Sequence, residues 1–254
     1  KKTLHTLVED AVERRMVADV PLGSFLSGGI DSSIVSGIAS KKVKHLNTFS
    51  IGFKDEPYFD ETKFANLTAK HFNTNHTVFS LSNEDLFANL HDVLDYIDEP
   101  FADSSALAVH ILSMHTRKKV TVSLSGDGAD EIFAGYNKHQ ASLKAREKSF
   151  LNSALIAFQP ILDQLPQSRN SWLGNKIRQA NRFAIGAKLT NAERYWRWCS
   201  FADDVYARNI QRQPLDQSII KTRMKFYLSN ISEIGNLNEE LYTDMQLVLQ
   251  NDML

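Results

Sequence analysis

The sequence predicts an α/β fold, a doubly wound parallel sheet followed by a mainly helical C-terminal layer. Apolar residues in the first half alternate between strand-like and helix-like spacing with short connections, which is typical of parallel strands joined by crossover helices. Glycine-rich turns follow two of the expected strands. From residue 138 onward no segment has a convincing strand pattern, and all three tryptophans lie there. With 254 residues, 43% of them hydrophobic, the chain is long enough for one large core.

The elements of the first half follow from the spacing of apolar residues. In chain order we expect a helix at residues 4–17, a strand at 20–26, a helix whose apolar residues span 34–39, a strand at 46–53, a helix at 61–71, a strand at 76–81, one helix from there to residue 97, a helix at 105–118 and a strand at 119–125. Ser82 is a suitable N-cap for the helix that follows it, because Asp85 stands three residues further on. That helix has the clearest amphipathic pattern in the chain.

The second half is expected to form a helical layer on the sheet. The sequence contains no internal repeat and no low-complexity linker, so the boundary is a change of periodicity alone. We place it between residues 137 and 138. This gives an α/β core at residues 1–137 and a helical part of the same domain at residues 138–254.

The composition excludes several classes of function. Lys and Arg total 29 against 30 Asp and Glu, a formal net charge of −1, so the chain lacks the overall basic charge of a protein that binds nucleic acid. Cys199 is the only cysteine, which excludes an internal disulfide and any Cys-x-x-Cys site. We expect it to be a small buried residue rather than a nucleophile. The apolar runs are far shorter than the roughly 20 residues of a membrane span, and the first residues lack the apolar region of a signal peptide. We therefore expect a cytoplasmic protein without a nucleic-acid or membrane partner.

The first candidate site is the Ser-Gly-Gly-Ile-Asp-Ser loop at residues 27–32, between an expected strand and an expected helix. Its two glycines let backbone amides approach an anion, its serines add hydroxyl donors, and the helix N-terminus favours negative charge. The alternative is a Ser-Gly turn that only begins a helix. The loop lacks the Gly-Lys-Ser/Thr of a Walker P-loop and the Gly-x-Gly-x-x-Gly of a dinucleotide site. Asp31 would repel a phosphate unless a cation such as Mg²⁺ lies between them.

The second candidate site is the Ser-Gly-Asp-Gly-Ala-Asp-Glu loop at residues 125–131, directly after an expected strand. Its three acids stand close together in sequence, although an acidic turn before a helix is also common. Because the C-terminal ends of parallel strands lie at one edge of a sheet, we expect both loops to face the same crevice. An acidic loop opposite a phosphate-binding loop predicts a shared site for a metal ion and a polyphosphate.

Together these segments resemble a known family. The motif at residues 27–32 is similar to the signature of the PP-loop (N-type) ATP pyrophosphatases. Three further segments narrow the resemblance to the synthetase domain of the asparagine synthetase family. They are Val-Pro-Leu-Gly at residues 20–23, Asp-Glu-Pro-Phe-Ala-Asp-Ser-Ser-Ala at residues 98–106, and residues 124–136, which continue from the acidic loop to Ile-Phe-Ala-Gly-Tyr. The similarity extends from about residue 4 to residue 136 and continues weakly through the helical half.

The resemblance implies an ATP-dependent amide synthesis. Members of this family adenylate the side-chain carboxylate of aspartate and release pyrophosphate, and ammonia then displaces AMP to give asparagine. The implied cofactors are ATP and Mg²⁺. The implied partners are aspartate and ammonia, the latter from a glutaminase domain, and a homodimer is compatible with the resemblance.

The resemblance also implies a role for individual residues. Those that would contact ATP or its pyrophosphate are Leu26, Ser27, Gly28, Gly29, Asp31, Ser32, Ile51, Ser125 and Gly126. Asp31 and Asp130 would hold Mg²⁺, and Asp127 would be the catalytic residue. Asp103 and Ser104 would lie near the substrate.

The sequence also departs from the family pattern. Asp127 stands where glutamine-dependent members carry Glu, the Arg-Ala pair expected near Ser104 is missing, and residues 108–110 read Ala-Val-His in place of Pro-x-Tyr. The glutaminase domain and the family's downstream motifs are not found in these residues, so we expect the chain to be part of a longer protein. Two alternatives stay open. One is a relative that adenylates another carboxylate, such as a β-lactam-forming synthetase or an amidotransferase of a polysaccharide or peptide pathway. The other is a nucleotide-binding domain without chemistry.

Overall fold

The computed structural model describes residues 1–98, 103, 105–147, 149–168, 171–200, 209, 212 and 216–253. The chain forms two compact units, Lys1–Asp127 and Gly128–Leu254, and each is described here by itself. The sequence-based boundary at residues 137 and 138 follows the change of periodicity, whereas the boundary between the compact units falls earlier, inside the acidic loop.

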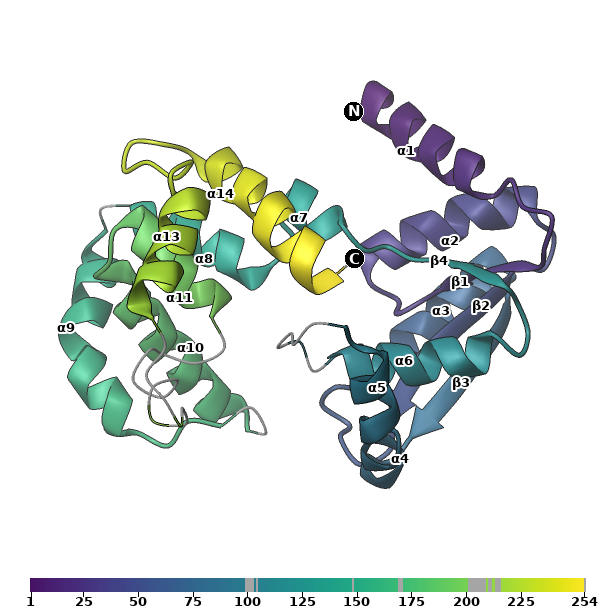
Figure 1. Ribbon diagram of the computed structural model, residues 1–254, viewed down its shortest axis with the longest axis horizontal. Coiled ribbons are helices and arrows are strands. Elements are labelled where there is room, and N and C mark those ends of the chain that lie inside the picture. Colours follow the sequence, from purple (N-terminus) through teal and green to yellow (C-terminus); the bar gives the residue numbers. More distant parts are fainter. Residues whose placement is uncertain are drawn as a thin grey trace. The chain divides into compact units, whose positions relative to one another are not determined.

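The first unit contains a four-stranded sheet in which all strands are parallel (Figure 1). Its strands are β1 (Leu22–Phe25), β2 (Asn47–Phe53), β3 (Asn75–Leu81) and β4 (Val122–Leu124), in the spatial order β3-β2-β1-β4. The prediction of a parallel α/β sheet is confirmed.

Helices cover both faces of this sheet. They are α1 (Lys2–Arg15), α2 (Ile30–Lys42), α3 (Thr62–Phe72), α4 (Asn83–Ala88), α5 (Leu90–Tyr96) and α6 (Ser105–Thr116). α2 packs on β1, α3 packs on β2 and β3, and α1 lies on α2. α6 packs on β2, α4 packs on β3, and both α4 and α5 contact α6. The connections through α2 and α3 lead from β1 to β2 and β3, whereas the connection through α4–α6 leads back to β4 on the other side of β1. Because such crossovers are right-handed, α2 and α3 lie on one face of the sheet and α4–α6 on the other.

The two faces of the sheet differ in polarity. Toward α6, the rings of Phe49 and Phe79 are stacked, and Phe79 stacks on His115 of α6. Toward α2 and α3, Ser24 Oγ lies 2.9 Å from the hydroxyl of a serine on α2, and buried Thr48 lies 2.9 Å from Nδ1 of His76. Period-two alternation along each strand produces this separation.

One predicted element is wrong. The single helix expected after Ser82 is two helices, α4 and α5, which are separated at Asn89. The side-chain amide of Asn89 donates to the carbonyl of Asp85 at 2.8 Å, and such local side-chain hydrogen bonds compete with a continuous helix. The predicted cap at Ser82 is confirmed, because its hydroxyl accepts from the amide of Asp85 in a capping box.

The second unit is helical in its described residues, as the sequence predicts, and no strand is assigned there. Its elements are α7 (Ala129–Phe133), α8 (Asn137–Arg146), α9 (Phe150–Gln164), α10 (Trp172–Ala187), α11 (Asn191–Cys199), α13 (Gln217–Leu228), α14 (Leu237–Asp244) and the π-helix η1 (Met245–Met253). α9 packs on α10, while α8 contacts α10, α11 and α14. Across the described ranges of both units, no helix is long and apolar enough to cross a membrane.

Candidate nucleotide-binding site

The loop between β1 and α2 forms the first part of the candidate site. The backbone turns through Ser27, Gly28 and Gly29 into α2. Gly28 has a φ of +85°, a conformation that residues with a Cβ rarely adopt. A Cβ at Gly28 would also lie 2.5 Å from the carbonyl carbon and 2.6 Å from the Cβ of Phe64 in α3. The turn and the close approach to α3 therefore both require glycine at this position.

The N-terminus of α2 offers hydrogen-bond donors to a ligand. The first helical bond runs from the amide of Ser33 to the carbonyl of Gly29 at 3.1 Å, so the amides of residues 30–32 precede the helical ladder. Within the described ranges, no group accepts a hydrogen bond from these three amides. Ser27 Oγ lies 2.9 Å from Ser32 Oγ and accepts from the amide of Gly29 at 3.2 Å. Amides, hydroxyls and the positive end of the helix dipole together suit phosphate oxygens.

The loop that follows β4 contacts the first turn of α2. A Cβ at Gly126 would lie 2.8 Å from the amide nitrogen of Ser32 and 3.1 Å from the Cβ of Asp31. β1 and β4 are adjacent parallel strands, so the start of the acidic loop lies at the same sheet edge as the Ser-Gly-Gly loop. That both loops face one crevice stays a prediction. From β1 the chain first adds β2 and β3 on one side, and then adds β4 on the other side of β1. The point between β1 and β4 is therefore a topological switch point, and open α/β sheets bind ligands at such points.

The acids of the two loops have different surroundings. Asp31 is half-buried in the first turn of α2, and Asp127 is exposed at the end of the first unit. Asp130 and Glu131 lie in α7, in the second unit. No group of three or more His, Cys, Asp or Glu side chains among the described residues is arranged to hold a metal ion. The assignment of Asp31 and Asp130 to Mg²⁺ stays a prediction.

Within the second unit, α7 is tied to the turn that follows it. The buried side chain of Glu131 accepts a hydrogen bond from the hydroxyl of Tyr136 at 2.6 Å. Burial raises the pKa of Tyr136, and the hydrogen bond to Glu131 raises it further, so the phenol stays protonated and donates. A Cβ at Gly135 would overlap Oδ1 of Asp130. Sequence reasoning gave Tyr136 and Gly135 no role, although both belong to the motif at residues 124–136.

Two residues expected near the adenine lie on different faces of the sheet. Leu26 is buried against Ala65 and Ala69 of α3. Ile51 is two residues from Phe49 in β2, so its side chain points toward the α6 face. The structure therefore does not bring the two side chains together, and their contact with a nucleotide stays a prediction.

The residues expected near the substrate precede α6. Asp103 accepts a hydrogen bond from the amide of Ser105 at 2.8 Å, which places its carboxylate at the start of that helix. Ser104 lies outside the described residues. The exposed Ser125 follows β4.

A pocket of about 810 Å³ lies elsewhere in the first unit. α5, α6 and the segment that contains β4 line it, with Asp92, Asp95, His110 and Arg117 among its polar residues. None of the site residues predicted from the sequence lines this pocket, and the sequence gave no sign of it.

Cys199 lies at the end of α11, where Lys138 donates to its sulfur at 3.3 Å. Burial raises the pKa of the thiol more than Lys138 lowers it. A protonated thiol is a poor nucleophile, which agrees with the expectation that Cys199 has no nucleophilic role.

Comparison with known proteins supports the resemblance. Residues 3–254 match the family described as asparagine synthase. The chain is 29% identical along its whole length to asparagine synthetase (glutamine-hydrolyzing) 1 of Bacillus subtilis (strain 168) and covers 39% of that protein. Over 52% of its length it is 45% identical to a putative asparagine synthetase (glutamine-hydrolyzing) 2 of Methanocaldococcus jannaschii, of which it covers 26%. It is also 37% identical over 59% of its length to a putative asparagine synthetase (glutamine-hydrolyzing) of Mycobacterium tuberculosis (strain ATCC 25618 / H37Rv), of which it covers 23%. The chain thus spans well under half the length of these curated relatives.

Proposed function

Because the chain belongs to the asparagine synthase family, we propose that the protein to which it belongs makes asparagine from aspartate, ammonia and ATP. The observation that carries the proposal is the contact between Gly126 and the first turn of α2. It joins two glycine loops at the switch point of a parallel sheet. There the backbone can approach a nucleoside triphosphate closely, and free amides can donate to its phosphates.

In the first step, a side-chain carboxylate oxygen of aspartate attacks the α-phosphorus of ATP. The bond from that phosphorus to the bridging oxygen breaks, and pyrophosphate leaves with the electron pair. The amides at residues 30–32 and the hydroxyls of Ser27 and Ser32 are the donors proposed for the pyrophosphate oxygens. Positioning and neutralisation of charge are the main demands of such a transfer.

Asp31 and Asp130 are the proposed ligands of Mg²⁺. Mg²⁺ takes oxygen ligands and commonly uses one or two carboxylates together with phosphate oxygens. Two aspartate carboxylates fit this donor set, and the missing side chain at Gly135 leaves room for the carboxylate of Asp130. When bound, the ion would neutralise the departing pyrophosphate.

In the second step, ammonia attacks the activated carbonyl carbon and AMP leaves. Asp127 is the proposed acceptor of a proton from the attacking amine, and its exposed carboxylate is accessible to a substrate. The relatives named above are glutamine-hydrolyzing enzymes. We propose that ammonia reaches this domain from a glutaminase domain of the same longer protein.

We expect Asp127→Asn, in the full-length protein, to lower amide synthesis by about 10²–10⁴-fold, the usual contribution of a general acid or base. ATP affinity should stay unchanged, because Asp127 is not among the residues proposed to contact ATP or Mg²⁺. Asp127→Glu should also lower the rate, since the longer side chain places the carboxylate about 1.5 Å further out and Gly126 holds the loop against α2. The measurements are aspartate-dependent pyrophosphate release, asparagine formation and nucleotide affinity.

Wild-type rates in Asp127→Asn would remove this residue from the mechanism. A second candidate function rests on the Asp at this position, because a shorter acid leaves room for a larger substrate. If the wild-type protein releases no pyrophosphate with aspartate but does so with another carboxylic acid, the protein is a synthetase for that acid instead.

A further inference from the structure

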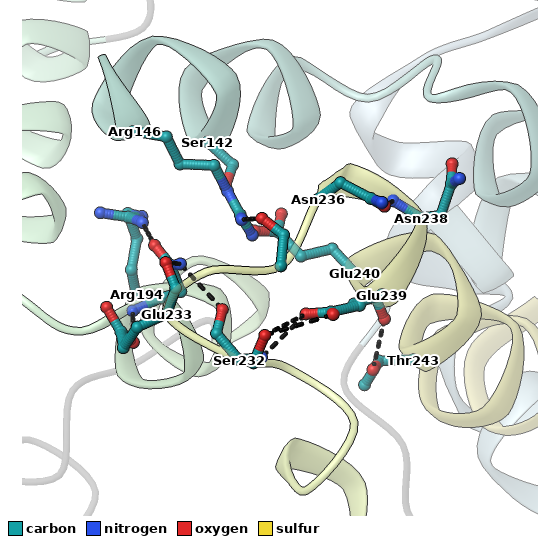
Figure 2. Close-up of polar contacts among 12 residues, drawn as sticks. Ser142, Arg146, Arg194, Ser232, Glu233, Asn236, Asn238, Glu239, Glu240 and Thr243 are labelled. Carbon is teal, nitrogen blue, oxygen red and sulfur yellow. Dashed lines mark hydrogen bonds and ion pairs between the residues drawn. The ribbon is translucent and has the colours of Figure 1, made fainter.

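α14 presents two buried carboxylates to α8. Glu240 and Asp244 stand four residues apart, on one side of α14. Their partners on α8 are also spaced along one side of that helix, at His139, Ser142 and Arg146. Figure 2 shows one end of this interface, where Glu240 accepts from Ser142 at 2.5 Å and from Arg146 at 2.6 Å. Helix α14 is thus joined to α8 by charged hydrogen bonds.

Asp244 forms the other end of the interface and is 0% exposed. Its carboxylate accepts from Lys138 Nζ at 2.7 Å, from His139 Nε2 at 2.6 Å and from the hydroxyl of Tyr195 at 2.5 Å. Burial raises the pKa of Asp244, but the hydrogen bond from His139 and the charge of Lys138 lower it by more, so the pKa lies below its ordinary value. The carboxylate is therefore ionised at neutral pH.

Lys138 connects Asp244 to the acidic segment. Its ammonium lies 5.1 Å from the ring centre of Tyr136 and 5.4 Å from that of Tyr195, a cation–π position between two aromatic rings. Tyr136 in turn donates to Glu131, which adjoins Asp130 in α7. A continuous set of contacts thus runs from Asp244 through Lys138 and Tyr136 to the acids of α7.

α7 is also supported directly. α14 and η1 both pack on it, and a Cβ at Gly128, the first residue before α7, would be in van der Waals contact with Leu249 of η1. The segment at residues 129–136 has little structure of its own, because α7 contains only five residues and a helix this short is not stable alone. Its conformation depends on the elements behind it.

We propose that Asp244 is a positioning residue for the acidic segment at residues 129–136, and that it acts by holding Lys138 and His139 at the start of α8. Buried ionic groups are often no more stabilising than apolar residues of similar size, and their best-attested use is to fix one register. Here Asp244 fixes the first residues of α8 through Lys138 and His139, and with them the position of Tyr136 at the end of the acidic segment. The link to catalysis rests on the proposed function, because it requires Asp130 to bind Mg²⁺ with ATP.

The test compares Asp244→Asn with Glu240→Gln in the full-length protein. Both changes remove one buried carboxylate charge from the same helix interface, and we expect both to lower the thermal midpoint. Only Asp244→Asn should speed hydrogen exchange of the amides at residues 129–136. It should also raise the Mg²⁺ concentration needed for half-maximal MgATP binding and pyrophosphate release by about tenfold, as loss of a group that orients a metal ligand typically does. Glu240→Gln should leave both of these quantities unchanged.

Tyr195→Phe is the second test variant, to be used if Asp244→Asn does not fold. It removes one of the three hydrogen bonds to Asp244 and keeps the ring beside Lys138, so a smaller change in the same direction is expected. Two outcomes would overturn the proposal. In one, Asp244→Asn and Glu240→Gln change the rate of hydrogen exchange at residues 129–136 equally, and in the other neither variant changes it. Exchange does not depend on the reaction, so a wild-type protein inactive with aspartate would refute the proposed function while the exchange data still decide the role of Asp244.

Discussion

At the scale of single residues, the candidate site depends on glycines that leave room for other groups. A Cβ at Gly28 would collide with Phe64, and one at Gly126 would approach the amide of Ser32. The sequence predicted the turn at Gly28, because Ser-Gly-Gly between a strand and a helix is a local signal. It could not predict what Gly126 touches. That contact follows from the pairing of β1 with β4, which are far apart in the chain.

Gly28→Ala tests the loop conformation. We expect it to lower the free energy of unfolding by at least about 1–2 kcal/mol, because a residue with a Cβ must then occupy a left-handed conformation, and the collision with α3 adds to this cost. ATP affinity should fall as well, since the loop must move. Chemical denaturation and nucleotide titration measure the two effects.

Gly29→Ala is the matched control for stability. Gly29 has a φ of −64°, and the nearest group to an added Cβ is the flexible hydroxyl of Ser27 at 3.2 Å. Its effect on the free energy of unfolding should therefore be clearly smaller than that of Gly28→Ala. Equal losses for the two variants would show that the left-handed turn and the contact with Phe64 contribute little.

At the scale of elements, the sequence predicted the order of strands and helices in the first unit, because period-two and helical patterns follow each other there with short connections. It failed at residues 82–97, where one apolar pattern spans two helices. The two helices are separated at Asn89, whose side-chain amide donates to the carbonyl of Asp85, and this single polar residue leaves the apolar pattern unchanged. The polar face of the sheet was also not predicted, since buried hydroxyls and an imidazole reduce the apolar signal on which strand prediction depends.

His76 makes that polar face sensitive to pH. Its ring nitrogens lie 2.9 Å from the hydroxyl of Thr48 and 3.2 Å from that of Ser50. Burial lowers the pKa of His76 below its ordinary value of 6.5. The unfolded chain therefore takes up this proton at a higher pH than the folded protein does. The contribution to stability is fully present above about pH 6.5 and falls as the pH drops from there toward the lower pKa of the folded state.

The measurement is the free energy of unfolding of the full-length protein as a function of pH, for the wild type and for His76→Gln. We expect the wild type to lose stability more steeply than the variant just below pH 6.5, because glutamine has no proton to gain. The difference between the two curves isolates His76 from other groups that titrate nearby. Parallel curves across this range would contradict the role of His76.

At the scale of the whole molecule, the two units differ in what fills their interiors. The first unit buries apolar side chains between helices and sheet, such as those of Ile38, Leu46 and Phe49. Among the described residues of the second unit, Glu240 and Asp244 are more deeply buried than Tyr195 and Ile231. Hydrophobic periodicity therefore predicted the elements of the first unit apart from the division between α4 and α5, whereas in the second unit it indicated only helices. A sequence pattern does not distinguish a buried carboxylate from a solvent-exposed one.

A nucleotide site in the first unit also has a consequence for the stability of that unit. A ligand that binds only the folded state, at about 100 times its dissociation constant, raises the free energy of unfolding by about 2.7 kcal/mol. We expect MgATP to slow hydrogen exchange of the amides of β1 and β2 accordingly, because the phosphate-binding loop extends directly from β1. Removing Mg²⁺ with EDTA at the same ATP concentration should reduce this gain in the free energy of unfolding. Asp31→Asn should reduce it as well, since the proposed site needs a cation between Asp31 and the phosphates.

The dissociation constant of MgATP is measured independently by calorimetry, so the expected gain in the free energy of unfolding is known before hydrogen exchange is recorded. Tight binding of MgATP without any added protection in β1 and β2 would show that the nucleotide binds elsewhere in the protein.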